Sequence, residues 1–172
     1  MSVKKILTEP NKMLRQVSKN VEKVDNVERE LMDDMLDTMY DAPGIGLAAI
    51  QIGIPKRIIV MDISKDENKK EPRYFVNPII KNKNDEKAKY EEGCLSVPDQ
   101  FAEIERPNTC EVEYLDYNGK KQILKATGLL ATCIQHEMDH LEGILFIDYL
   151  SKLKKSMIIK KLSKIKLNRE IL

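Results

Sequence analysis

Two histidines, the only ones in the chain, stand four residues apart in the sequence HEMDH at 136–140. On an α-helix this spacing places both imidazole rings on the same face, one turn apart, where His136 and His140 can bind one metal ion. Glu137, which follows the first histidine, can then reach a water molecule beside the ion without being a ligand itself. The pattern predicts a metal centre that activates water for hydrolysis, in preference to two solvated histidines.

The histidine pair needs a third partner, because a catalytic divalent metal usually has three protein ligands and one open position. The sequence after the second histidine holds few carboxylates, namely Glu142, Asp148 and Glu170. Glu142 follows too closely to turn back easily toward the histidines. Metallopeptidases with the HExxH motif normally take their third ligand from further along the chain, where little sequence remains here. A cysteine is therefore the better candidate.

The chain offers three cysteines for this role. Cys110 falls in a strand pattern, and Cys133 lies on the same helix as the histidines, where we expect it to line a pocket or the core. Cys94 is favoured, because Gly93 before it allows the backbone to approach a metal or substrate closely, and Pro98 fixes the chain afterwards. An isolated cysteine is more often a small buried apolar residue, so the incomplete histidine pair carries the argument for Cys94.

A second group of interest is the sequence GIGLAAIQ at 44–51. Its first six residues match the dinucleotide pattern G-x-G-x-x-A, which requires a strand before it and a helix after it. Here a helical pattern and Pro43 come before it, so we exclude a nucleotide site. Two interpretations remain: a tight turn packed on the core, or a loop that holds an extended substrate by its backbone near Gly46, with Gln51 offering a side-chain amide.

The elements that position these groups follow from periodicity and turn signals. Asp25 and Glu28 form a capping box, and Val27, Leu31, Met35 and Met39 recur every fourth residue, which predicts an amphipathic helix ending near residue 42. Strands are expected at 57–62, 74–77, 110–114 and 122–124, with a hairpin turn at Asn118-Gly119. The charge-rich stretches 66–71 and 81–89 should be solvated loops or edge strands.

Two further helices are expected in the C-terminal third. The first runs from about Gly128 to Leu141, with Thr127 as its N-cap and Gly143 as its stop. The second begins past Leu150, with Ile158, Leu162 and Ile165 on one stripe and Lys160 and Lys164 on the far side. This order of helices and hairpins predicts one α+β domain over residues 1–172, with mainly antiparallel sheet and a basic C-terminal helix from about residue 151.

Length and composition exclude several classes of protein. The 172 residues fit one domain with a hydrophobic core, and the chain contains no apolar run long enough for a membrane span or a signal peptide. An odd number of irregularly spaced cysteines argues against a disulfide framework and for the reducing cytoplasm. Charge is unevenly placed, because residues 148–172 carry +6 and the rest of the chain −5.

Three segments together resemble the signature motifs of the peptide deformylases: GIGLAAIQ at 44–51, EGCLS at 92–96 and QHEMDH at 135–140. They occur in the family's order and at similar spacing, and the likeness extends over nearly the whole chain. The resemblance implies an α+β fold in which antiparallel sheets embrace the HExxH helix. The segment PDQF at 98–101 departs from many bacterial relatives, which carry arginine near Phe101.

The activity implied by this resemblance is removal of the formyl group from N-formylmethionyl nascent chains, with release of formate. Cys94, His136 and His140 would bind the metal, and Glu137 would act as acid and base. Gln51 and the backbone N–H of Leu95 would stabilise the oxyanion. Ligand preference alone fits zinc or iron, and the family resemblance favours Fe²⁺, with Ni²⁺, Co²⁺ or Zn²⁺ as substitutes.

The substrate should meet an apolar slot beside the metal. We expect Ile45, Leu95, Cys133 and the ring of His136 to receive the methionine side chain, whose unbranched, polarizable shape suits such a slot. Gly46 and Gly93, which have no side chain, should lie beside the backbone of the bound peptide. A basic C-terminal helix on an acidic body suits a polyanionic surface, so we expect contact with the ribosome near its exit tunnel, but not with DNA or a membrane.

Two other functions are compatible with the HExxH spacing. A small metallopeptidase would cut internal peptide bonds, but it calls for a third histidine or acidic ligand that the sequence lacks. A non-catalytic module with a structural zinc would need a fourth ligand from Cys110 or Cys133, and it would leave Glu137 without a role.

Overall fold

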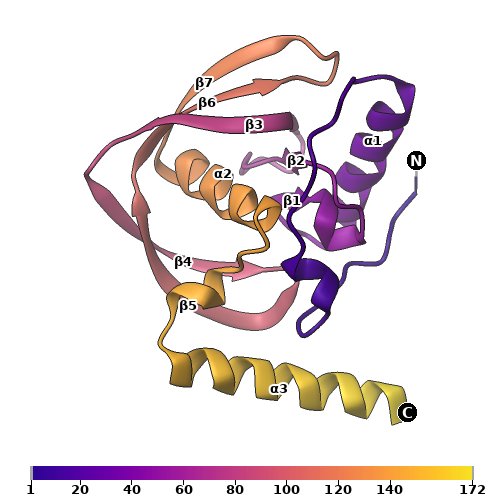
Figure 1. Cartoon of the computed structure of the whole chain (residues 1–172), viewed down its shortest axis with the longest axis vertical. Helices are drawn as coiled ribbons and strands as arrows, with labels where there is room; N and C mark the ends of the chain where they lie inside the picture. The colour runs from indigo at the N-terminus through magenta and orange to yellow at the C-terminus, as the bar shows by residue number, and fades with distance from the viewer. Residues whose placement is uncertain (1, 172) are drawn as a thin grey trace.

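The predicted α+β architecture is confirmed in the computed structural model, which describes residues 2–171, with side chains as far as residue 168. Two antiparallel sheets lie on either side of helix α2 (Gly128–Leu141), the helix that carries the HEMDH sequence (Figure 1). The strands are β1 (Gly46–Ala48), β2 (Ile58–Met61), β3 (Arg73–Lys83), β4 (Lys87–Cys94), β5 (Val97–Pro107), β6 (Thr109–Leu115) and β7 (Lys121–Thr127). Short 3-10 helices are η1 (Lys12–Arg15), η2 (Ala49–Ile52) and η3 (Phe146–Tyr149).

The larger sheet has the strand order β1-β2-β3-β6-β7, and every neighbouring pair is antiparallel. Its β6–β7 hairpin turns at Asn118-Gly119 as expected, with Gly119 at a φ of 80° that glycine adopts without strain. The smaller sheet is the β4–β5 hairpin, which reverses direction directly after Cys94, where Cys94 pairs with Val97. The turn of this hairpin therefore places the EGCLS motif beside β1, the edge strand of the larger sheet, and close to η2.

Helix α1 (Asn26–Asp41) begins with the capping box predicted from Asp25 and Glu28. The Asp25 side chain accepts a hydrogen bond from the Val27 N–H at 2.9 Å, and the Glu28 carboxylate accepts one from the Asp25 N–H at 3.3 Å. The apolar stripe begins one turn later than expected, because Val27 is exposed whereas Leu31 and the methionines behind it are buried. Glu28 in the same turn is buried, so Val27 lies on the solvent side of the first turn.

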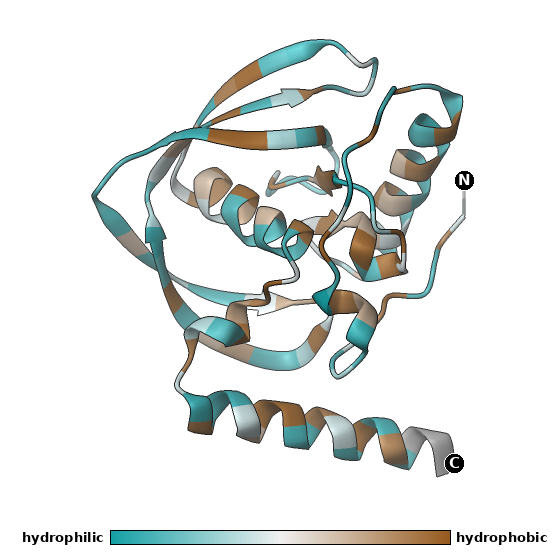
Figure 2. Ribbon diagram, viewed as in Figure 1, coloured by the Kyte–Doolittle hydropathy of each residue, from teal (hydrophilic) through white to brown (hydrophobic). Residues whose placement is uncertain are grey.

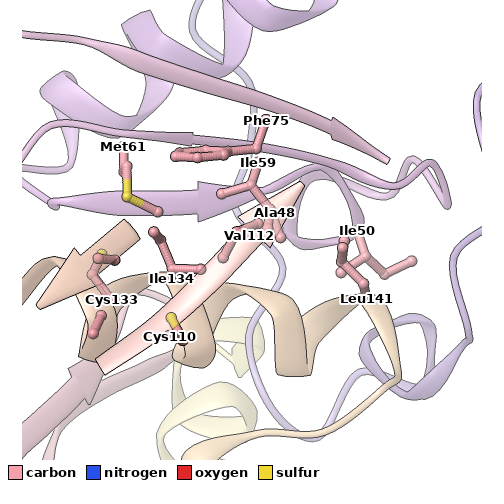
Figure 3. Close-up of a cluster of buried hydrophobic side chains, with 12 residues drawn as sticks. Ala48, Ile50, Ile59, Met61, Phe75, Cys110, Val112, Cys133, Ile134 and Leu141 are labelled. Atoms are coloured by element: carbon pink, nitrogen blue, oxygen red, sulfur yellow. The ribbon is translucent and has the colours of Figure 1, made fainter. Parts of the chain in front are cut away.

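The core beneath the site joins α2 to the larger sheet (Figure 3). Ile134 and Cys133 of α2 pack among side chains of the strands, including Ile59, Phe75 and Val112. Burying an apolar side chain of this size contributes about 1.5–3 kcal/mol to folding stability. Because this packing fixes α2 against the sheet, the two histidines are held in a set orientation.

Helix α3 (Lys152–Ile171) runs along the outer side of the β4–β5 hairpin (Figure 1). Ile158 and Leu162 pack in a cluster with Val97, Ile104 and Phe146, as the stripe predicted, but Ile165 is 36% exposed because the helix extends past the hairpin at that point. Figure 2 shows hydrophilic and hydrophobic residues alternating along this helix. Within the described residues, no helix is long and apolar enough to cross a membrane.

Two local predictions were incomplete. Thr127 occupies the N-cap position of α2, but its side chain makes no capping hydrogen bond there. The charge-rich stretch 81–89 contains the end of β3 and the start of β4, in agreement with the edge-strand alternative. The sequence did not reveal that β4 and β5 form a hairpin across 87–107, because charged residues on its exposed face mask the period-two pattern.

Candidate active site

A cavity of about 490 Å³ opens between β1, the β4–β5 hairpin and α2. Most of its wall is apolar or uncharged, as in sites that bind small ligands and peptide side chains. Residues of all three predicted motifs line it: Ile45, Gly46, Gln51, Gly93, Cys94, Leu95, Cys133, His136 and Glu137. The fold thus brings together segments that lie up to about ninety residues apart in the sequence.

Three donor atoms converge at the inner end of this cavity. The Sγ of Cys94 and one ring nitrogen each from His136 and His140 lie within 4.8 Å of one another, and Cys94 Sγ is 3.4 Å from His140 Nε2. Two ligands that share a tetrahedral metal at ~2.0–2.3 Å lie roughly 3.5 Å apart. The buried Oε2 of Glu137 beside them has no hydrogen-bond partner among residues 2–171, as expected of an atom that faces a metal-activated water. The residues therefore fit a divalent metal.

The orientation of His136 is set by Glu92, whose only signal in the sequence is its place in the EGCLS motif. His136 Nδ1 lies 2.8 Å from Glu92 Oε1, which leaves Nε2 facing the other donors. Arg106 holds the same carboxylate through two bonds of 2.7 and 3.0 Å, and donates a third to Asp139 at 2.8 Å. Burial alone would raise the pKa of Glu92, but the bonds to His136 and Arg106 outweigh it and lower the pKa.

Burial has the largest effect on the pKa of two further groups, Glu137 and His140. Burial raises the pKa of the Glu137 carboxyl from its ordinary 4.5 to about 7, a value suited to a group that takes up and returns a proton near neutral pH. Burial also lowers the pKa of His140, which keeps the ring neutral with a lone pair available for a metal. The Glu137 carboxylate packs directly against Gly46, where a Cβ would lie 2.7 Å from its Oε1.

Gln51 is fixed by both ends of its side-chain amide. Its Oε1 accepts a hydrogen bond from the Ala48 N–H at 2.9 Å, and its Nε2 donates to Ser96 Oγ at 3.0 Å. This arrangement excludes the flipped amide and directs Nε2 toward Cys94 Sγ, 3.5 Å away. Ser96, which is fully buried, was not singled out from the sequence, although a serine inside an apolar motif usually marks such a bond.

The other predicted residues fall on the cavity wall or outside it. Cys133 does both things expected of it, since it lines the cavity and packs in the core, and burial raises the pKa of its thiol. Gly93 borders the cavity, but the group that lies closest to it is the ring of Phe101 on the facing strand. Among the described residues, neither Cys110 nor Cys133 joins the group of potential metal ligands, as a structural zinc site would require.

Comparisons with known proteins identify the family. The sequence model of the polypeptide deformylases matches residues 3–156. The chain belongs to this family. It is 86% identical to the peptide deformylase of Pelagibacter ubique over 99% of both chains, and 59% identical to that of Phenylobacterium zucineum over 95% of this chain and 97% of the other. A crystal structure of peptide deformylase from Ehrlichia chaffeensis superposes with a TM-score of 0.91 at 46% identity, covering 96% and 97% of the two chains.

Family membership decides between the functions that the sequence left open. Peptide deformylases are metal-dependent hydrolases that remove the formyl group from nascent peptides, so the chain is an enzyme of this type. The cavity and its donor group agree with this activity, and neither the metallopeptidase nor the structural zinc module is needed to explain them.

Proposed function

We propose that Cys94, His136 and His140 hold one divalent metal, with Fe²⁺ as the favoured ion and Ni²⁺, Co²⁺ or Zn²⁺ as substitutes. The convergence of one sulfur and two imidazole nitrogens within 4.8 Å is the observation that carries this proposal. Thiolate and imidazole ligands suit iron and zinc better than they suit magnesium or calcium. A metal bound there would act as a Lewis acid toward the formyl carbonyl and lower the pKa of water.

Glu137 is the proton carrier in this proposal. With a pKa of about 7, its carboxylate can accept a proton from the attacking water at Oε2 and then deliver it to the leaving amine. Gln51 Nε2 and the backbone N–H of Leu95 would hold the charge that develops on the formyl oxygen.

The first side chain of the peptide would enter the slot between Ile45, Leu95, Cys133 and the ring of His136. Gly46 and Gly93 border the same cavity and leave room for the backbone of an extended peptide. The residues that form the slot are uncharged, which favours methionine over a charged residue at the first position of the peptide.

The ligand assignment can be tested with a matched pair of cysteine variants. Cys94→Ala should lose the metal and formate release from formyl-Met peptides, whereas Cys110→Ala, which alters a buried cysteine outside the donor group, should keep both. Metal content by elemental analysis and anaerobic formate release should be measured on the same samples. A Cys94→Ala enzyme with full metal content would contradict the assignment.

We also propose that α3 binds the ribosome near the exit tunnel through its exposed lysines. The argument is charge: residues 148–172 carry +6, and ribosomal RNA is a polyanion. Deleting the helix would uncover the cluster around Phe146, so a charge change is the sharper test. Replacing Lys160, Lys161 and Lys164 by glutamine should weaken co-sedimentation with ribosomes at low salt and spare the turnover of short peptides.

The control for the ribosome test replaces three exposed lysines elsewhere, Lys65, Lys69 and Lys87, so that the net charge of the two variants is equal. Equal sedimentation of both variants would show that α3 is not the contact.

The cytoplasm is the proposed site of action, because the described structure contains three free thiols and Cys94 must stay reduced to bind a metal. Cell fractionation that recovered the activity outside the cytoplasm would contradict this.

A further inference from the structure

The N-terminal segment makes backbone hydrogen bonds to two of the three motif segments and to the residue that follows the third. The Leu7 N–H donates to the carbonyl of Gln51 at 2.7 Å, and the Glu9 N–H donates to the carbonyl of Ser96 at 2.8 Å. Further along, the Ser18 N–H donates to the carbonyl of Leu141 at 2.8 Å. In Figure 1 this indigo segment passes the C-terminal end of α2 before it enters α1. No step of the reaction described above uses it.

The bonds to Gln51 and Ser96 connect the two segments that supply the proposed oxyanion donors. Gln51 provides one donor through its side chain, and Leu95, the neighbour of Ser96, provides the other through its backbone. The nitrogens of Leu7 and Glu9 are at most ~7 Å apart, because the two residues are only two positions apart in the chain. The segment therefore limits the separation of the two carbonyls to which it binds.

A closed ring of bonds results. One side of the ring is the chain from Leu7 to Glu9, and the other is the hydrogen bond from Gln51 Nε2 to Ser96 Oγ at 3.0 Å. A ring closed on both sides resists changes in the spacing of its members more strongly than either bond alone, because opening it requires two buried bonds to break.

Arg15 connects this ring of bonds to η3 and to the turn after α2. Its guanidinium pairs with the buried carboxylate of Glu9 at 2.5 Å and with Asp148 of η3 at 2.6 Å, and it donates to the carbonyl of Gly143 at 3.3 Å. Gly143 packs directly on the backbone of Arg15, where a Cβ would collide with it. Arg15 thus joins the N-terminal segment to the turn that follows α2.

We propose that the segment from Leu7 to Arg15 is a clamp that sets the spacing of the oxyanion donors Gln51 and Leu95, with Arg15 as a positioning residue that touches no substrate. The proposal rests on the oxyanion roles given to Gln51 and Leu95 under the proposed function. Loosening the clamp should slow the chemical step more than it weakens substrate binding, since misplacing a catalytic group by ~1 Å can cost on the order of 10²-fold.

The test is a double-mutant cycle on the metal-loaded, full-length enzyme. Arg15→Met keeps most of the side-chain length but removes the charge, and Gln51→Ala removes one oxyanion donor. Arg15→Met alone should lower kcat for a formyl-Met peptide about tenfold, less than the ~10²–10³-fold cost of losing a donor outright. KM should change less than about twofold. In the Gln51→Ala background the same substitution should cost less than about threefold, because the group it positions is absent.

Two further variants accompany the cycle. Lys12→Met removes an exposed cation from the same short helix and should leave kcat unchanged. Arg15→Lys keeps the charge but cannot bind Glu9, Asp148 and Gly143 with one fork of donors, so it should recover part of the lost kcat. If Arg15→Met does not fold, Arg15→Lys takes its place in the cycle with a smaller expected loss.

The outcomes separate the clamp from the function on which it depends. An equal loss from Arg15→Met in both backgrounds, or an unchanged kcat with only a lower melting temperature, would overturn the clamp while leaving the oxyanion assignment standing. An unchanged kcat in Gln51→Ala alone would instead overturn the role of Gln51, and the clamp with it.

Discussion

His136 and Glu92 form a buried pair in which the histidine Nδ1 lies 2.8 Å from the carboxylate oxygen, with neither side chain more than one tenth exposed. A carboxylate in this position fixes the ring orientation and makes the opposite nitrogen a better electron donor. Arg106, itself buried, keeps Glu92 ionised through two hydrogen bonds. The metal site is therefore supported by a chain of charges that runs from α2 through β4 to β5.

The first prediction concerns this pair. Glu92→Gln should weaken metal binding by about 10–100-fold, because the amide holds the His136 N–H less strongly. The variant should also lower the free energy of unfolding by about 3 kcal/mol, since Arg106 loses its bidentate partner while remaining buried. Competition with a chelator and urea unfolding measure the two effects. Glu103→Gln, on the exposed face of β5, is the control and should change neither quantity.

A second prediction follows from the contact between Gly46 and Glu137. A methyl group on Gly46 would lie 2.7 Å from Glu137 Oε1, so the carboxylate must shift in Gly46→Ala. The end of that side chain can move without disturbing the core, and we expect full metal content and little loss of stability. Activity should fall by on the order of 10²-fold, because the proton acceptor is displaced. Steady-state kcat with metal analysis tests this, and normal turnover would refute the role of Glu137.

The third prediction is a pH dependence of stability at Asp62, which does not line the cavity. Burial alone would raise its pKa, but hydrogen bonds from Tyr40 at 2.6 Å and from two backbone N–H groups outweigh it, and the pKa lies below the ordinary 3.8. A lowered pKa means that the ionised group stabilises the folded state above pH ~4. This stabilisation disappears as the pH falls through the lowered value.

Asp62→Asn should therefore reduce the free energy of unfolding at pH 7 by about 1.5–3 kcal/mol, the usual contribution of hydrogen bonds to a charged group. The difference from the unaltered chain should shrink steadily below pH ~4. Urea unfolding at several pH values gives both results. A difference that stays constant down to pH 3 would show that Asp62 titrates in the same way in both states.

The sequence predicted where the candidate site residues lie better than it predicted which residues hold them in place. His136, Glu137 and His140 follow one helix, so local periodicity places them correctly without any knowledge of the fold. The side chains of Glu92 and Arg106 meet only because β4 and β5 pair in a hairpin that the charged exposed residues concealed. The bonds of Leu7 and Glu9 involve the backbone alone, and no side-chain pattern can reveal them.

The last prediction is the preference for the first residue of the substrate. Methionine should fill the slot beside His136, and formyl-norleucine peptides, which have the same shape without sulfur, should be hydrolysed almost as fast. Formyl-Ala peptides should lose ~1.5–3 kcal/mol of transition-state binding, or roughly 10–150-fold in kcat/KM, because most of the apolar contact is missing.

Two further substrates extend this comparison, one with a charged first side chain and one with a larger acyl group. Formyl-Asp peptides should react more slowly than formyl-Ala peptides, because the inner wall of the cavity offers no cation to balance a buried carboxylate and Glu137 lies nearby. Acetyl-Met peptides should be poor substrates, since the extra methyl group crowds the space between Gln51 and Leu95. Formate or acetate release from the metal-loaded enzyme measures the series. If formyl-Ala and formyl-Met peptides reacted equally fast, the slot would not bind the side chain in the transition state.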